Sequence, residues 1–151
     1  MIDSIKGLLF FKDPSMVVVD LHGMRLKLTI TVATYNRLPN KGKEVDLLTY
    51  LNVREDLLEL FGFANEEERN MFLMLNTITG IGPRSAMNIL SGSNPADFKK
   101  NIIAGDVKSL TVIPGIGPKT AKRIIVELKE KFVDQDGKKI KVTIYTIKHK
   151  T

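Results

Sequence analysis

The spacing of apolar residues changes partway along the chain. In the first part, Leu26, Leu28 and Ile30 alternate with polar side chains, which is the period of a half-buried strand. Short apolar runs on either side are separated by turn signals such as His22-Gly23. The pattern predicts strands over residues 2–11, 16–21, 26–30, 45–53 and 57–63. Five short strands in such a segment favour a small closed β-barrel of the oligonucleotide-binding (OB) type.

From Asn65 onward the apolar residues follow a helical period instead. Asn65 is a suitable helix cap, and Glu68 nearly completes a capping box. The longest apolar stripe consists of Ala121, Ile124, Ile125, Leu128 and Phe132. Glycine, proline and capping residues divide 65–132 into five predicted helices. We therefore expect an α+β protein with an OB-type barrel over 1–63 and a compact α-helical domain over 64–132.

One short segment is repeated within the helical region. The sequence from Ile78 to Ala86, Ile-Thr-Gly-Ile-Gly-Pro-Arg-Ser-Ala, recurs from Ile113 to Ala121 as Ile-Pro-Gly-Ile-Gly-Pro-Lys-Thr-Ala. Each copy follows one predicted helix and leads into the next. The repeat predicts two tight glycine turns between helices, with a proline at the first helical position, where no N–H is needed.

These turns have the chemistry of a phosphate site. A glycine turn that opens a helix exposes backbone N–H groups at the positive end of the helix dipole, and basic side chains follow closely. The alternative is that each turn only joins two packed helices, but the presence of two copies favours phosphate binding. Such contacts read no base sequence, so we expect structure-selective binding. The predicted phosphate-binding residues are Gly80, Gly82, Arg84, Ser85, Gly115, Gly117, Lys119, Thr120, Lys122 and Arg123.

The distribution of charge is more informative than the net charge of +6. Acidic and basic residues balance before residue 64, and the positive excess lies in the helical region and in residues 133–151. The chain has no cysteine, which excludes disulfides and thiolate metal sites. It has neither a signal-peptide pattern nor an apolar run of membrane-spanning length, so we expect a cytoplasmic protein without a membrane partner.

The sequence offers no catalytic constellation. The P-loop pattern is broken by Pro118, and the dinucleotide-binding motif lacks its third glycine in both copies of the repeat. The two histidines, His22 and His149, lie in a turn and in the C-terminal segment. We therefore expect no catalytic residue, no metal site and no cofactor.

The order of these features resembles the RuvA family. A β-rich start is followed by Val53-Arg54-Glu55-Asp56, then by Leu60-Phe61-Gly62-Phe63, two helix-hairpin-helix turns, and Ile125-Val126-Glu127-Leu128-Lys129. RuvA is the subunit of the bacterial branch-migration complex that binds the Holliday junction, the four-way DNA junction of recombination and repair. The resemblance covers residues 1–132. It implies an OB barrel, a helix-hairpin-helix domain, a homotetramer that holds an open junction, and an ATPase partner of the RuvB type.

The resemblance also gives a role to two acidic residues. Glu55 and Asp56 match the acidic pin of the family. Two carboxylates at a β-turn are ordinarily just solvated. Four copies around a tetramer axis would instead gather negative charge at the junction centre, where it would repel phosphates and keep the strands apart.

The chain departs from the family after Phe132. RuvA continues through a flexible linker into a small three-helix domain that contacts the motor, whereas residues 133–151 are basic and alternate like a strand. We expect a basic strand-like tail, so that the chain is truncated, recruits its motor differently, or recruits none. Two other functions stay open. One is a helix-hairpin-helix DNA scaffold without motor coupling; the other is a helix-hairpin-helix DNA glycosylase, which Val133-Asp134 would suit and the barrel opposes.

Overall fold

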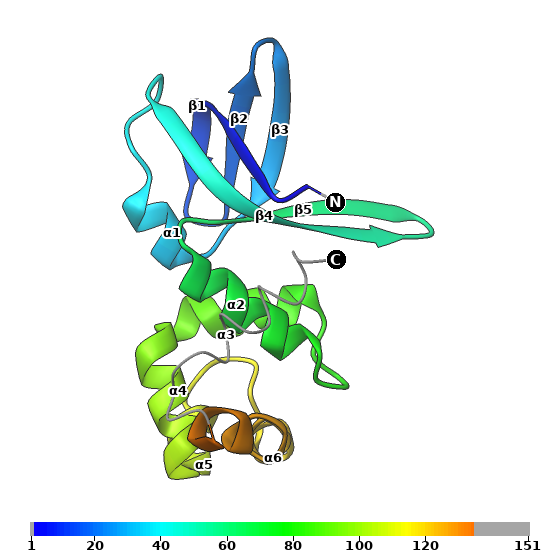
Figure 1. Cartoon of the computed structure of the whole chain (residues 1–151), viewed down its shortest axis with the longest axis vertical. Helices are drawn as coiled ribbons and strands as arrows, with labels where there is room; N and C mark the ends of the chain where they lie inside the picture. Colours follow the sequence, from blue (N-terminus) through cyan, green and yellow to red (C-terminus); the bar gives the residue numbers. More distant parts are fainter. Residues whose placement is uncertain (1, 135–151) are drawn as a thin grey trace. The chain divides into compact units, whose positions relative to one another are not determined.

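The computed structural model describes residues 2–134, and the chain divides into two compact units. The first unit ends at Arg69 and the second begins at Asn70. The strands of the first unit are β1 (Ser4–Asp13), β2 (Met16–Leu21), β3 (Met24–Thr29), β4 (Glu44–Arg54) and β5 (Leu57–Phe63). They form a closed barrel in the order β1-β2-β3-β5-β4, which confirms the predicted OB-type barrel (Figure 1).

Every second side chain along the strands points inward, and these side chains fill the interior of the barrel. Leu9, Val17, Val19, Leu28 and Leu47 point inward and are almost completely buried. All strand pairs are antiparallel except β3 with β5, whose parallel contact at Thr29 and Phe61 closes the barrel. The predicted turn between β2 and β3 also forms, with positive φ at both of its residues (57° at His22 and 105° at Gly23), as in a type I′ hairpin.

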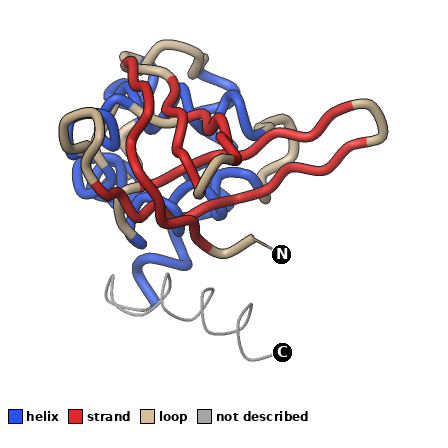
Figure 2. Tube along the Cα trace, turned by 90° about the horizontal axis from the view of Figure 1, so that it is seen from above, coloured by secondary structure: helices blue, strands red, loops and turns tan. Residues whose placement is uncertain are grey.

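Strands β4 and β5 form a hairpin that is longer than the barrel requires. Their antiparallel ladder runs from the pair Leu48–Phe63 to the pair Arg54–Leu57, and Glu55-Asp56 makes the turn. Figures 1 and 2 show this hairpin extending well beyond the other strands. Every residue from Val53 to Leu58 is exposed.

The barrel also contains a short helix that the sequence pattern did not predict. Helix α1 (Val32–Arg37) begins at Thr31, whose hydroxyl accepts a hydrogen bond from Thr34 N–H (3.1 Å). The Thr31 and Thr34 hydroxyls donate to the two carboxylate oxygens of Glu68 (2.7 and 2.6 Å), and all three side chains are buried. Glu68, which follows the last barrel strand in the sequence, therefore holds α1 in place through these two hydrogen bonds.

The five predicted helices are all present. They are α2 (Glu66–Asn76), α3 (Pro83–Gly92), α4 (Pro95–Ala104), α5 (Val107–Thr111) and α6 (Pro118–Asp134). Asn65 caps α2 as predicted, because its side chain accepts from Glu68 N–H (2.9 Å). Helices α4, α5 and α6 pack together. On α6 the predicted stripe is buried at Ala121, Ile124, Leu128 and Phe132, with Ile125 half-buried.

The predicted strand-like tail falls largely on residues 135–151, which lie outside the described residues. Its first two positions, Val133 and Asp134, are the last two residues of α6.

Candidate nucleic-acid interface

The two repeated turns have the same backbone hydrogen bonds. The first turn joins α2 to α3 and the second joins α5 to α6. In the first turn the bonds run from Ile78 N–H to Leu75 O (3.1 Å), Ile81 N–H to Ile78 O (3.0 Å) and Ala86 N–H to Gly82 O (2.9 Å). In the second turn they run from Ile113 N–H to Leu110 O (3.1 Å), Ile116 N–H to Ile113 O (3.1 Å) and Ala121 N–H to Gly117 O (2.9 Å). The sequence repeat is therefore a structural repeat.

The glycines of each turn serve two different purposes. Gly80 and Gly115 both have a φ of +93°, a conformation that side chains rarely adopt, so they allow the turn itself. Gly82 has an extended backbone (φ −88°, ψ 179°) that any residue can adopt. A Cβ added at Gly82 or Gly117 would meet no atom within 4 Å. The fold does not need glycine at these two positions, but a ligand that approaches the backbone closely would.

Each turn has buried isoleucines that attach it to the core and exposed glycines that face solvent. Ile78, Ile81, Ile113 and Ile116 are all buried. The glycines beside them are exposed. The isoleucines hold each turn on the helical core, and the backbone of the glycines faces solvent.

The helices that begin at these turns carry no acidic residue in their first turn. This holds for both α3 and α6, whereas α2 begins with three glutamates and α4 has Asp97 in its first turn. The first N–H groups of a helix have no carbonyl within the helix to bond, and they lie at the positive end of its dipole. Nearby carboxylates would oppose an anion there, so α3 and α6 suit a phosphate better than α2 and α4 do.

The predicted side chains surround these helix ends. Among the predicted phosphate-binding residues Thr120 is half-buried and the others are exposed. Arg123 has a second role that the sequence did not predict: its Nη1 donates to the carbonyl oxygen of Thr79 (2.8 Å). This bond fastens α6, which begins at the second turn, to the first turn. The first turn is therefore linked to the helix that begins at the second turn, and both turns belong to one unit.

A cap on α5 precedes the second turn. The Asp106 carboxylate accepts hydrogen bonds from the Ser109 hydroxyl (2.6 Å) and from Ser109 N–H (3.0 Å). These bonds lower the pKa of Asp106 below its ordinary value of 3.8, with the hydroxyl bond as the largest cause. The carboxylate thus stays charged at neutral pH and fixes the start of the helix that leads into the turn.

The predicted acidic pair lies at the tip of the β4–β5 hairpin. Glu55 and Asp56 are both exposed, and neither forms a salt bridge with another described residue. Their neighbours Val53 and Leu58 are exposed by 57% and 70%. The tip thus combines two carboxylates with bare apolar side chains.

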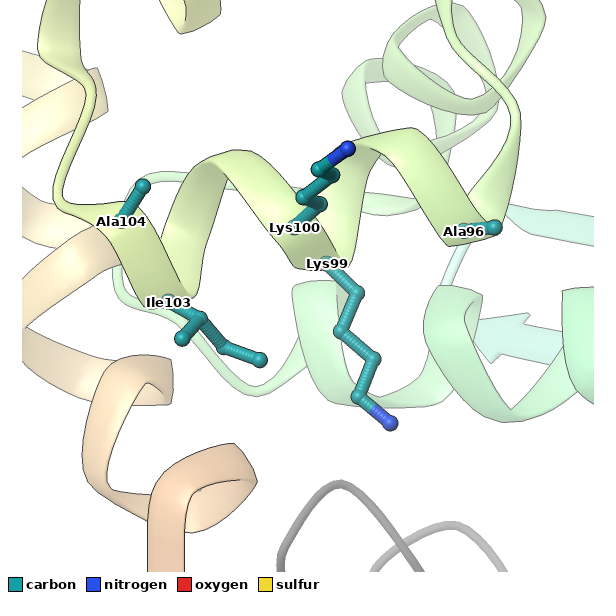
Figure 3. Close-up of a pocket in the computed structure, with 5 residues that line it drawn as sticks. All are labelled: Ala96, Lys99, Lys100, Ile103 and Ala104. Atoms are coloured by element: carbon teal, nitrogen blue, oxygen red, sulfur yellow. The ribbon is translucent and has the colours of Figure 1, made fainter.

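A shallow depression along α4 offers no catalytic chemistry. It is lined by Ala96, Lys99, Lys100, Ile103 and Ala104 (Figure 3). The two lysine side chains point away from each other, and Lys99 Nζ lies 5.3 Å from the centroid of the Phe132 ring.

Within residues 2–134, no group of three His, Cys, Asp or Glu side chains could hold a metal ion. Nor is any helix in this range both long and apolar enough to cross a membrane.

Comparison with known proteins matches both units. A family described as the RuvA N terminal domain matches residues 1–62, and one described as a SAM-like helix-hairpin-helix tandem matches residues 72–130. A Holliday junction branch migration complex subunit RuvA from Janthinobacterium sp. (strain Marseille) is 47% identical over 132 residues, which are 87% of this chain and 69% of the relative. The protein of the same name from Thermoanaerobacter sp. (strain X514) is 44% identical over 132 residues, 87% of this chain and 71% of the relative. That from Geobacter metallireducens is 40% identical over 136 residues, 90% of this chain and 68% of the relative.

Proposed function

Because the chain belongs to the RuvA family, we propose that it binds four-way DNA junctions through the backbone of its two glycine turns. The observation that carries this proposal is the pair of equivalent turns, each leading into a helix whose first turn has no acidic residue. Gly82 and Gly117 let a phosphate approach the exposed N–H groups. Arg84, Lys119 and Lys122 add attraction over a longer range.

The proposed binding selects DNA by shape. Contacts to phosphates position a duplex but do not distinguish its bases, so two such turns grip DNA without regard to its sequence. Four copies in a homotetramer would hold the four arms of a junction. The Glu55-Asp56 tips would then repel phosphates at the centre and keep the crossing strands apart.

In this proposal the protein is the non-catalytic subunit of a branch-migration complex. It acts in the cytoplasm in DNA recombination and repair, and a DNA-pumping ATPase of the RuvB type supplies the energy. Its relatives are named as subunits of such a complex, which supports this assignment. A branch-migration assay with and without a RuvB-type ATPase tests the coupling. Motor-dependent strand exchange supports it, and an ATPase that is unaffected by the protein would leave a DNA scaffold as the function.

A mobility-shift titration tests junction binding itself. A four-way junction and a linear duplex of equal length are titrated at several salt concentrations. We expect tighter binding to the junction and a steep loss with salt, with a log–log slope of about 0.9 for each phosphate neutralised. Equal affinity for both DNAs, or affinity independent of salt, would contradict the proposal.

A further inference from the structure

The β4–β5 hairpin carries an apolar stripe that begins at the barrel core and ends in solvent. Leu51 faces Leu60 across the ladder, and Val53 faces Leu58. Side chains two residues apart on a strand point to the same face, so these two pairs form one stripe. Leu60 packs against the barrel core, whereas Val53 and Leu58 are 57% and 70% exposed.

The opposite face of the hairpin differs in character. Its pairs are Asn52 with Glu59 and Arg54 with Leu57. Leu57 is 36% exposed, about half as much as Leu58. The stripe is therefore confined to one face, and Leu57 provides a matched position on the other face for the same substitution.

The charges beside the stripe restrict what can cover it. Glu55 and Asp56 follow Val53 closely along the chain and stand at the tip of the same hairpin. A phosphate that approached the stripe would be repelled by both carboxylates. A second copy that packed its own stripe here in the same direction would bring its two carboxylates into direct contact with these two, whereas the tips of the proposed homotetramer surround DNA at the junction centre. The flat face of a DNA base has neither problem, because it is uncharged and largely apolar.

We propose that Val53 and Leu58 form an apolar wedge that contacts bases unstacked at the crossover of a DNA junction. This inference rests on the proposed junction binding and adds to it a contact with bases. DNA-binding proteins that separate base steps insert apolar side chains between them in the same way. The two carboxylates keep phosphates away from the tip, and the wedge then covers the base faces that the parted strands expose.

Fluorescence of 2-aminopurine placed at the crossover of a four-way junction tests the wedge. The unchanged protein is expected to alter the emission, because this base analogue reports on its stacking. Leu58→Gln and Val53→Thr should remove most of that change while the affinity measured by mobility shift falls less than threefold. Leu57→Gln, the same change on the opposite face, should leave both signals as they are. Leu58 is so exposed that its substitution leaves the fold intact, which thermal unfolding would verify.

Three results would contradict the proposed contact between the wedge and bases, and each can be distinguished from the others. If Leu58→Gln and Leu57→Gln alter the emission equally, the stripe has no special contact with bases. If Leu58→Gln changes the oligomeric state in sedimentation, a second copy covers the stripe instead. If the unchanged protein shows no preference for junctions over duplex, the proposed function fails first and the wedge fails with it.

Discussion

Replacing Gly82 and Gly117 together by valine separates DNA binding from folding. Gly82 already has an extended backbone, and a Cβ at either position meets open space. The expected cost to folding is the loss of a favourable helix cap, about 1 kcal/mol or less for each helix. The valine side chains would instead occupy the space through which a phosphate reaches the N–H groups.

The effect on binding should be much larger. A hydrogen bond to a charged group contributes about 1.5–3 kcal/mol, so losing one bond at each turn weakens binding by about one to two orders of magnitude per turn. The double substitution should therefore reduce junction affinity to the level of the background in a mobility-shift titration. Circular dichroism should show the same helical content as in the unchanged protein.

The neighbouring glycines provide the contrasting control. Gly80→Ala with Gly115→Ala forces a side chain into a φ of +93° at both turns, at a cost of about 1–3 kcal/mol each. At Gly80 the new Cβ would also lie 3.2 Å from Arg123 Nη1. This pair should therefore lower the melting temperature more than the valine pair does. Wild-type affinity in the valine pair would refute the idea that backbone N–H groups hold the DNA.

The remaining predictions concern the charges of the site. Glu55→Gln with Asp56→Asn should keep or increase junction affinity, because the carboxylates no longer repel phosphates at the junction centre. The same loss should reduce selectivity for the open junction and impair branch migration. Markedly weaker binding by a folded variant would count against an acidic pin. Lys119→Met should lower the log–log salt slope of binding by about 0.9 for each Lys119–phosphate contact that is lost, summed over the subunits of the homotetramer. Arg123→Met should lower it less and instead reduce the free energy of unfolding by about 1 kcal/mol, because its guanidinium already donates to the Thr79 carbonyl. Equal salt slopes for these two variants would show that Arg123 serves DNA as much as Lys119 does.

The elements with a regular apolar period could be predicted from the sequence. The stripe of α6 and the alternation of Leu26, Leu28 and Ile30 depend only on local spacing, and both led to the observed element. Helix α1 lacked such a signal. Its six residues include the β-branched Val32 and Thr34, and its position depends on a carboxylate more than thirty residues away.

The long-range contacts of the site could not be predicted either, because no local sequence pattern signals them. Glu68 was interpreted as part of a capping box, and its N–H does bond Asn65, but its carboxylate accepts from two buried threonines of the barrel unit. The bond from Arg123 to Thr79 joins residues 44 positions apart. The lack of acidic residues at the start of α3 and α6 was visible in the sequence, and comparison with α2 and α4 would have revealed it. The DNA-binding roles of these residues remain predictions.

The extended β4–β5 hairpin exposes strand edges that favour aggregation, and the charged residues at its tip oppose that aggregation. Thr49 N–H on β4 still donates to the carbonyl oxygen of Asp3, just before β1 (2.9 Å), and β3 pairs with β5 at Phe61. At the far end of the hairpin, from Val53 to Leu58, no third strand among the described residues pairs with either outer edge, so these edges could recruit a strand from another molecule and lead to aggregation. Glu55 and Asp56 oppose edge-to-edge association of hairpins that run in the same direction, because it would bring their carboxylates together. Neutralising the tip should therefore shorten the shelf life of the concentrated protein even where DNA binding improves.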